Sequence, residues 1–510
     1  MPHRRTGHYI CAMGIRSMFS KPLARWVRQR QQPWREQPGE AQQRWLHNLV
    51  NRAKTTQFGR DHHFADIQTV ADFRQAVPIR DYEILKPYVE RVVHGEPDIL
   101  WPGKPAYFAK TSGTTSGTKY IPLTKESLPN HINSARDALL CYIDETGKSA
   151  FLDQKLIFLS GSPELEQKAG IYTGRLSGIV NHHIPAYLRS NQMPSYETNT
   201  IEDWETKLDR IIDETINQPM SLISGIPPWV QMYFDRIQAR TGKAIKDVFP
   251  QFSMFVYGGV NFEPYRARLF ESIGKPIDSI ETYPASEGFI AYQDSQQAEG
   301  LLLLVDSGIF FEFVPADQYF AENPRRLTVD EVELGVNYAV IINNNAGLWG
   351  YSLGDTVKFV SRHPHRIVVT GRIKHFISAF GEHVIGEEVE KALQYAMQQQ
   401  PGTEVVEFTV APMVSPAEGL PYHEWLIEFA QPPADAARFS SDLNTRLAQL
   451  NVYYDDLMQG NILRPLVMTP LPRGAFQQYM KAHGKLGGQN KVPRLSNDRT
   501  LANGLLVVMR

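Results

Sequence analysis

The sequence predicts an α/β fold, with a large N-terminal domain of mostly parallel strands and a small α+β domain at the C-terminal end. Apolar runs that end in a polar or glycine-containing turn recur at residues 155–159, 221–225, 252–256 and 277–282. Most of them are followed by a stretch with helical periodicity, and this alternation is typical of parallel-sheet units. From residue 301 the strand-like runs are separated by turns alone, which favours an antiparallel or barrel-like subdomain.

The composition is that of an ordinary globular protein. The chain has 510 residues, of which 42% are hydrophobic and 21% charged, and its net charge is −2. This balance supplies material for a core and argues against a protein that coats nucleic acid. The two cysteines, Cys11 and Cys141, exclude a disulfide framework and a cysteine-based zinc site, so we expect a reducing, cytoplasmic location. No apolar run approaches the length of a membrane span.

The N-terminal segment is strongly basic. Residues 1–35 contain eight Lys or Arg and no Asp or Glu. A transit segment is disfavoured because serine is scarce and no apolar stretch precedes a small-residue cleavage site. We expect a partly disordered basic terminus or a first helix, and a weak affinity for anionic surfaces stays open.

The remaining elements follow from periodicity and turn residues. Helices are predicted at 39–53, 127–142, 202–216, 387–399 and 434–449, and later strands at 301–305, 309–314, 338–343, 357–360, 366–370, 405–412 and 424–430. A junction rich in glycine and polar residues precedes the helix at 387. We therefore expect an N-terminal domain over 1–372, a hinge over 373–386 and a mobile C-terminal domain over 387–510.

The stretch from Thr111 to Lys119 reads T-S-G-T-T-S-G-T-K and predicts a phosphate-binding loop. Glycines let the backbone approach a phosphate, hydroxyl and N–H groups donate to its oxygens, and lysine adds a positive charge. The alternative is a polar surface turn. The spacing does not fit the P-loop pattern, because Gly113 and Gly117 are one residue too close and Thr118 precedes the lysine.

Four more polar stretches stand out. They are Tyr283-Pro-Ala-Ser-Glu287 at a predicted strand end, Tyr351-Ser-Leu-Gly-Asp355 before a predicted strand, Gly371-Arg372 after the next, and a late segment around Lys491. Each has a structural alternative: Glu287 and Asp355 could be turn residues, and Lys491 could be one charge of a basic tail.

Taken in order, these motifs resemble the Gretchen Hagen family of acyl acid–amido synthetases, in its bacterial branch. That family belongs to the adenylate-forming superfamily of acyl-CoA synthetases, adenylation domains and luciferases. The resemblance extends from Trp45 to Arg494 and also includes Ser224-Gly-Ile-Pro227 and Gly258-Gly-Val-Asn-Phe262.

The resemblance implies a ligase that uses ATP and Mg²⁺. ATP adenylates a small carboxylic acid, and an amine, expected to be an amino acid, then displaces AMP and forms an amide. The resemblance implies phosphate contacts from Thr111, Ser112, Gly113, Thr114, Thr115, Gly117 and Lys119. It also implies Glu287 as the Mg²⁺ ligand, nucleotide contacts from Tyr283 and Ser286, and ribose contacts from Asp355 with Arg372 beside it. Lys491 is implied as the catalytic lysine that enters the site for adenylation.

The chain departs from the family pattern in three places. Ser116 stands where the general superfamily loop has glycine, and plant members place the loop lysine where Tyr120 stands here. The C-terminal region is shorter than in plant members. These departures leave adenylation untouched but make the transfer of plant substrate preferences unsafe.

Two other functions stay open at this point. A CoA or carrier-protein ligase would share the first half-reaction and use a thiol acceptor, and a non-catalytic protein would bind the nucleotide without turning it over. The expected partners are small molecules only, an acid and an amine, with no nucleic acid and no integral membrane segment, and a monomer is our working expectation. An acyl pocket is expected from residues 185–187, 226–233 and 257–262.

Overall fold

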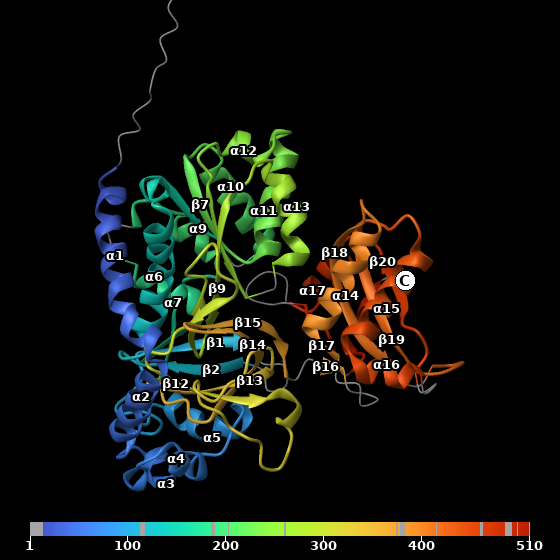
Figure 1. Cartoon of the computed structure of the whole chain (residues 1–510). Coiled ribbons are helices and arrows are strands. Elements are labelled where there is room, and N and C mark those ends of the chain that lie inside the picture. The colour runs from blue at the N-terminus through green and yellow to red at the C-terminus, as the bar shows by residue number, and fades with distance from the viewer. Residues whose placement is uncertain are drawn as a thin grey trace, which may run out of the picture.

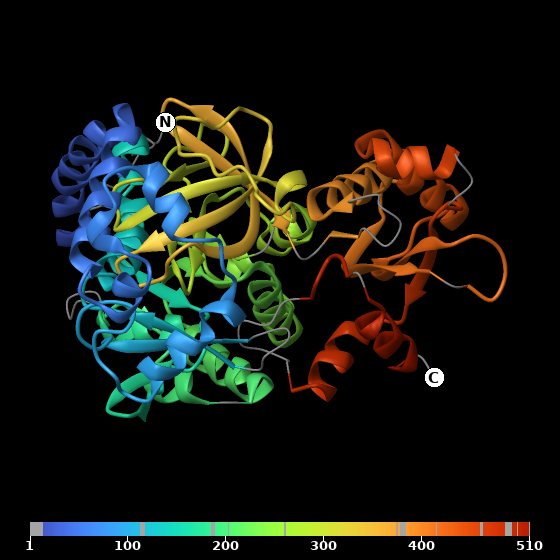
Figure 2. The same cartoon turned by 90° about the horizontal axis from the view of Figure 1, so that it is seen from below.

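The computed structural model describes residues 14–112, 118–184, 189–201, 203–259, 262–373, 376–377, 384–414, 416–459, 463–484, 492–496 and 498–508. Figure 1 shows a large body on the left and a small C-terminal domain on the right, and Figure 2 shows the same division from below. Within the described residues no helix is long and apolar enough to cross a membrane. The basic N-terminal segment forms a first helix, Ile15–Glu36, as one of the two predicted alternatives, and residues 1–13 lie outside the described residues.

One mixed sheet of eleven described strands forms the centre of the large body. Its order is β12 (Ile309–Pro315), β13 (Asn337–Asn344), β14 (Tyr351–Arg362), β15 (His365–Arg372), β11 (Leu301–Leu303), β10 (Gly288–Tyr292), β9 (Asp278–Ala285), β8 (Met254–Gly258), β7 (Met220–Ser224), β3 (Lys155–Phe158) and β6 (Gln192–Met193). The strands from β9 to β6 are parallel, and those from β12 to β9 are antiparallel. The antiparallel strands predicted after residue 301 thus continue the parallel sheet.

Helices cover this sheet on both sides (Figure 1). They include α6 (Leu128–Thr146), α7 (Leu176–His182), α9 (Tyr196–Thr200), α10 (Trp204–Thr215), α11 (Pro227–Thr241), α12 (Ile245–Val248) and α13 (Glu263–Ile273). The apolar face predicted for α10 is buried, with Leu208, Ile211 and Ile212 in one core cluster with β7 and α11. Burial of such a face supplies most of a helix's stability.

The N-terminal helices are α1 (Ile15–Glu36), α2 (Pro38–Ala53), α3 (Gln57–Asp61), α4 (Val70–Ala76) and α5 (Tyr82–Val93). A second, four-stranded sheet has the order β2 (Thr118–Leu123), β1 (Tyr107–Ser112), β5 (Ile171–Gly174), β4 (Glu166–Lys168). The antiparallel hairpin of β1 and β2 holds the predicted phosphate loop between its strands, as the flanking apolar residues predicted.

The C-terminal domain has its own core. Its sheet is β18 (Glu404–Met413), β19 (Tyr422–Gln431) and β20 (Val467–Leu471), packed with α14 (Gly386–Gln399), α15 (Ala436–Leu450), α16 (Val452–Gln459), α17 (Ala475–Ala482) and α18 (Thr500–Val508). Two short strands, β16 (Phe376–Ile377) and β17 (Val384–Ile385), pair at the connection to the large body. Trp425, Phe439 and Leu443 are fully buried in a cluster made only of residues from this domain and its connection.

One local expectation is wrong. Asp355 was expected just before a strand, but β14 begins at Tyr351 and contains it. The partner strand β13 pairs with Ser352 and again with Thr356, so residues 353–355 oppose Val340 alone. Gly354 makes this bulge possible because its φ is +77°. The bulge therefore positions Asp355 inside the sheet and beside β15.

Candidate active site

Seven of the predicted functional residues line one cleft of about 2230 Å³. The cleft is lined by Thr111, Lys119, Tyr283, Ser286, Glu287, Asp355 and Arg372. They come from two sheets and from segments far apart in the chain. Ser112 ends β1, whereas Gly113, Thr114, Thr115, Gly117 and Lys491 lie outside the described residues.

The predicted phosphate loop joins the antiparallel strands β1 and β2, a pair that we call the phosphate hairpin. Thr111 and Lys119 are cross-strand partners in the β1–β2 pair. The ammonium group of Lys119 lies 5.3 Å from the centroid of the Tyr82 ring. The hydroxyl of Tyr82 accepts a 2.9 Å hydrogen bond from the backbone N–H of Tyr120. Tyr82 thus supports the lysine and its strand from α5, a contact that no local pattern in the sequence indicates.

Glu287 lies in the tight turn between β9 and β10. The Tyr351 hydroxyl donates a 3.1 Å bond to its carboxylate, and the Asn344 side chain donates a 2.7 Å bond to its backbone carbonyl. Withdrawal from water raises the pKa of Glu287, and the Asp355 charge adds to this, whereas Lys119 acts in the opposite direction. A half-buried carboxylate whose charge lacks full compensation suits a cation that arrives with the substrate.

Asp355 is held by two side chains. The Tyr283 hydroxyl donates to Oδ2 at 2.7 Å, and Nε of Arg372 donates to Oδ1 at 2.9 Å. Asp355 and Arg372 face each other across the β14–β15 ladder, and this ion pair raises the pKa of the Arg372 guanidinium. The predicted strand ended at residue 282, but β9 continues to Ala285, so Tyr283 lies inside the strand. The result is a fixed carboxylate with remaining acceptor capacity, as hydroxyl recognition requires.

The C-terminal domain supplies one wall of the cleft. Val492, Pro493 and Arg494 line it directly after the position of Lys491. The Arg494 guanidinium forms an ion pair with Glu407 and donates a 2.6 Å bond to the hydroxyl of Tyr265 in α13. The sequence singled out neither Tyr265 nor Glu407, because their contact joins two domains.

Apolar side chains line a further part of the cleft. Ile226, Trp229 and Met232 come from the start of α11, and Tyr257 and Phe262 come from the end of β8 and the start of α13. These residues fall within the segments expected to form an acyl pocket, whereas residues 185–187 lie outside the described residues. An apolar lining with a few polar groups is typical of a small-molecule site.

A Mg²⁺ ion fits the donor set. Mg²⁺ is commonly bound by one or two carboxylates together with substrate phosphate oxygens and water. Glu287 offers one carboxylate on the same cleft as the phosphate hairpin. Among the described residues no group of three or more His, Cys, Asp or Glu could hold a metal ion.

Comparisons with family models and with known proteins all point to one family. The GH3 family N-terminal domain matches residues 28–207, the central domain residues 302–372 and the C-terminal domain residues 387–500. Jasmonoyl–L-amino acid synthetase GH3.5 of Oryza sativa is 23% identical over 83% of this chain and 86% of its own. Indole-3-acetic acid-amido synthetase GH3.3 of Arabidopsis thaliana is 21% identical over 89% and 88%. The match to jasmonoyl–L-amino acid synthetase JAR4 of Nicotiana attenuata, at 22% identity, covers 57% of this chain and 61% of that protein.

Solved structures show the same fold. The AtGH3.15 acyl acid amido synthetase in complex with 2,4-DB superposes with a TM-score of 0.77 at 15% identity, covering 96% of each chain. A 2-hydroxyisobutyryl-CoA ligase in its postadenylation state superposes with a TM-score of 0.59 at 14% identity, covering 93% of this chain and 94% of that one. The fold is that of adenylate-forming enzymes, and the three domain matches together show that the chain belongs to the GH3 family.

Proposed function

We propose that this protein adenylates a small carboxylic acid with ATP and transfers the acyl group to an amine, an amino acid, forming an amide. The observation that carries the proposal is the cleft that brings the phosphate hairpin, Glu287 and Asp355 together. The family relatives named as amido synthetases support the amine acceptor.

In the first step a carboxylate oxygen of the acid attacks the α-phosphorus of ATP, and the bond to pyrophosphate breaks. Lys119 and the loop from Thr111 would hold the phosphates by charge and hydrogen bonds, and Lys491 would stabilise the charge that develops between acid and phosphate. Mg²⁺, held by Glu287 and the phosphates, would neutralise charge on the leaving pyrophosphate. Asp355 would accept the ribose hydroxyls while Arg372 and Tyr283 keep its carboxylate in place, and Tyr283 and Ser286 would lie along the nucleotide.

In the second step the amine attacks the carbonyl carbon of the mixed anhydride, AMP leaves, and the amine loses a proton. One cleft must first exclude water and then admit the amine, which requires movement. We propose domains at 1–372 and 387–510 with a hinge at 373–386. The separate C-terminal core and the ends of the family matches at 372 and 387 support these boundaries.

We also propose that the chain belongs to the bacterial branch of the family, because its loop lysine stands at 119 and Tyr120 follows it. The buried thiol of Cys141, which is not in a disulfide, favours a reducing, cytoplasmic location. We also propose a monomer, since the predicted site residues that line the cleft all come from one chain.

A panel of carboxylic acids and amino acids tests the function. Pyrophosphate should be released only with ATP and an accepted acid, and mass spectrometry should find an amide when a suitable amino acid is added. A thioester formed with CoA in place of the amide would favour the alternative function, a CoA ligase. The fold that the chain shares with a CoA ligase is the reason to test this alternative. Nucleotide binding without pyrophosphate release for any acid would contradict both.

A further inference from the structure

Helix α1 is fixed to the large body by buried polar contacts on one side. Arg28 and Arg35 donate to the fully buried carboxylate of Asp294 at 2.9 and 2.6 Å, and that carboxylate also accepts from Arg366. In the first turn of α1, the Ser17 hydroxyl donates to the carbonyl of Ser149 at 2.9 Å. Breaking such buried charge pairs is costly, so α1 cannot rotate to bury its opposite side.

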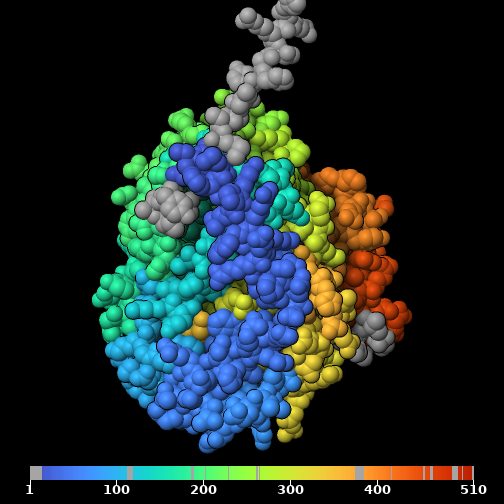
Figure 3. All heavy atoms as spheres, turned by 60° about the vertical axis from the view of Figure 1, so that its left-hand side comes forward, coloured from blue at the N-terminus to red at the C-terminus, as the bar shows by residue number. Residues whose placement is uncertain are grey.

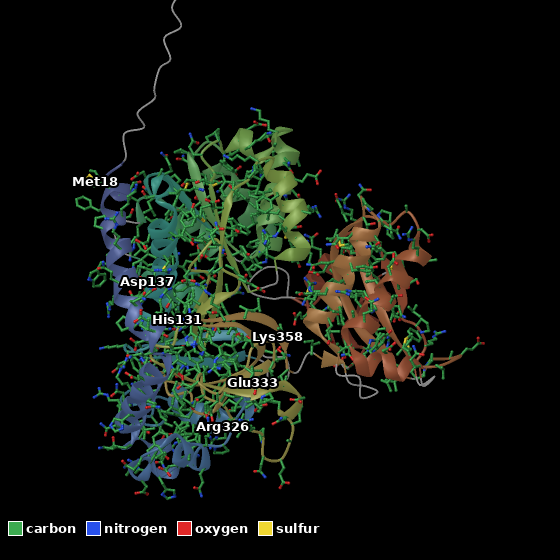
Figure 4. All side chains as sticks on the ribbon, in the orientation of Figure 1. Met18, His131, Asp137, Arg326, Glu333 and Lys358 are labelled. Atoms are coloured by element: carbon green, nitrogen blue, oxygen red, sulfur yellow. The ribbon has the colours of Figure 1, made fainter. Side chains whose placement is uncertain are left out.

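That opposite side is apolar and exposed. The exposed fractions are 75% for Ile15, 54% for Met18, 64% for Phe19, 41% for Leu23 and 51% for Trp26. Their spacing of three, four and seven residues places them on one stripe of the helix, which we call the outer stripe. Figure 3 shows α1 as a ridge on the surface, and in Figure 4 the side chain of Met18 points away from the body. A contiguous apolar stripe of this kind marks an interaction surface, unlike scattered exposed apolar residues.

Positive charge accompanies the outer stripe. Lys21, Arg25 and Arg30 lie on the same helix, and α1 has no acidic residue before Glu36. The Arg30 guanidinium lies 5.5 Å from the centroid of the Trp26 ring. Two described acidic groups lie against this part of α1, and both already have partners: Asp137 of α6 pairs with Arg136, and Asp153 accepts hydrogen bonds from the backbone N–H groups of Gly14 and Ser17. The charge of the surface is therefore complementary to an anionic partner.

We propose that the outer stripe of α1 binds the surface of an anionic lipid bilayer. Trp, Phe and Leu on one side with Lys and Arg along the border are typical of helices that lie in the membrane interface, where apolar burial and charge attraction act together. Figure 1 places α1 on the side of the large body away from the C-terminal domain, so a bound bilayer leaves the cleft and its moving domain clear.

Sedimentation with lipid vesicles tests this proposal on the full chain. The wild type should bind vesicles that contain phosphatidylglycerol and bind neutral phosphatidylcholine vesicles much more weakly. The double change Phe19→Ser with Trp26→Ser should lower the partition coefficient about tenfold or more, because both side chains lose their apolar burial. Lys21→Gln with Arg25→Gln should lower it on anionic vesicles only.

A matched control variant removes the same number of exposed apolar side chains elsewhere on the surface. Ile84 and Phe320 are 60% and 62% exposed at other places on the surface, so Ile84→Ser with Phe320→Ser should bind vesicles as the wild type does. All variants should retain wild-type pyrophosphate release, which separates this proposal from the proposed function. Absence of wild-type binding, or equal binding by the Phe19/Trp26 variant, would overturn the proposal. If the wild type does not bind vesicles but is a dimer in ultracentrifugation, and the Phe19/Trp26 variant is a monomer, the outer stripe instead binds a second copy of the chain.

Discussion

The hydroxyl of Tyr283 lies 2.7 Å from Oδ2 of Asp355, while Nε of Arg372 lies 2.9 Å from the other carboxylate oxygen. Both oxygens are thus oriented before any nucleotide arrives, which lowers the cost of binding. We expect Asp355→Asn to raise KM for ATP about tenfold or more, since a charged acceptor is lost. Tyr283→Phe should have a smaller effect. Initial rates at varied ATP concentration measure KM, and an unchanged KM in Asp355→Asn would show that Asp355 does not bind the ribose.

Glu287→Gln should separate activity from stability. A neutral amide is a poorer ligand for Mg²⁺, so adenylation should fall about 10²-fold or more. The raised pKa of Glu287 means that its charged form is disfavoured in the folded state, and the associated stability is lost as pH rises through that pKa. At neutral pH the amide removes this cost, so the variant without nucleotide should unfold at the wild-type temperature or above.

Glu299→Gln provides the control for Glu287, because Glu299 lines the same cleft. It should leave the rate and its Mg²⁺ dependence unchanged. Wild-type turnover by Glu287→Gln at low Mg²⁺ would show that another group binds the ion.

A hydrogen bond between domains should hold the arrangement seen in this structure. The Tyr265 hydroxyl lies 2.6 Å from Nη2 of Arg494 and 3.2 Å from Oε2 of Glu407. Tyr265→Phe removes a bond to charged groups, which should shift the equilibrium between domain arrangements about tenfold toward others. Small-angle scattering without nucleotide should record a broader distribution of sizes, and Tyr196→Phe on the surface should not. Identical profiles for the wild type and both variants, without ligand, with an ATP analogue and with AMP and amine, would contradict two claims. These are the role of the Tyr265 hydrogen bond in domain arrangement and the proposed hinge.

Much of the fold follows from local patterns, since the expected strands and helices recur within a few residues of their observed bounds. Asp355 illustrates the limit. Its motif was visible, but its place inside β14 depends on a bulge opposite Val340, and pairing with a distant strand is not encoded in local periodicity.

Other contacts have no sequence signal at all. Tyr82 reaches the phosphate hairpin from a helix that precedes it, and Tyr265 meets Arg494 across 229 positions. Such contacts depend on tertiary packing and on domain placement. The exposed side of α1 shows the same limit. The sequence indicated that this segment is basic, but the face that is buried depends on the ion pairs of Arg28 and Arg35 with Asp294.

His131 should make the protein sensitive to acid. Its ring is 3% exposed in α6, and Nδ1 has no hydrogen-bond partner among the described residues. Burial lowers the pKa of His131 to about 4. The unfolded chain binds the proton near pH 6.5, so folded stability falls as pH decreases from about 6.5 to 4, by about 3 kcal/mol in total. His131→Leu should show a smaller loss over this range in urea unfolding at several pH values, and parallel curves for the two proteins would contradict the assignment.

Lys491 should act in one half-reaction only. Val492, Pro493 and Arg494 line the cleft, and Pro493 restricts the backbone directly after that position. A lysine that stabilises charge between the acid and the α-phosphate acts before pyrophosphate leaves and has no such role afterwards. Lys491→Ala should therefore lower acyl-adenylate formation about 10²-fold or more, yet still convert a supplied acyl-adenylate and amine to the amide.

Lys481 offers the matched control for Lys491. It is a nearby lysine whose ammonium lies 3.3 Å from Glu205 in an exposed ion pair, and such pairs contribute little. Lys481→Ala should leave both half-reactions close to wild type. Equal loss of both half-reactions in a folded Lys491→Ala protein would indicate a role in docking the domain, because docking serves adenylation and transfer alike. If neither half-reaction is lost, Lys491 is a charge of the basic tail, and Lys119 and Arg372, which line the same cleft, become the next candidates for the catalytic cation.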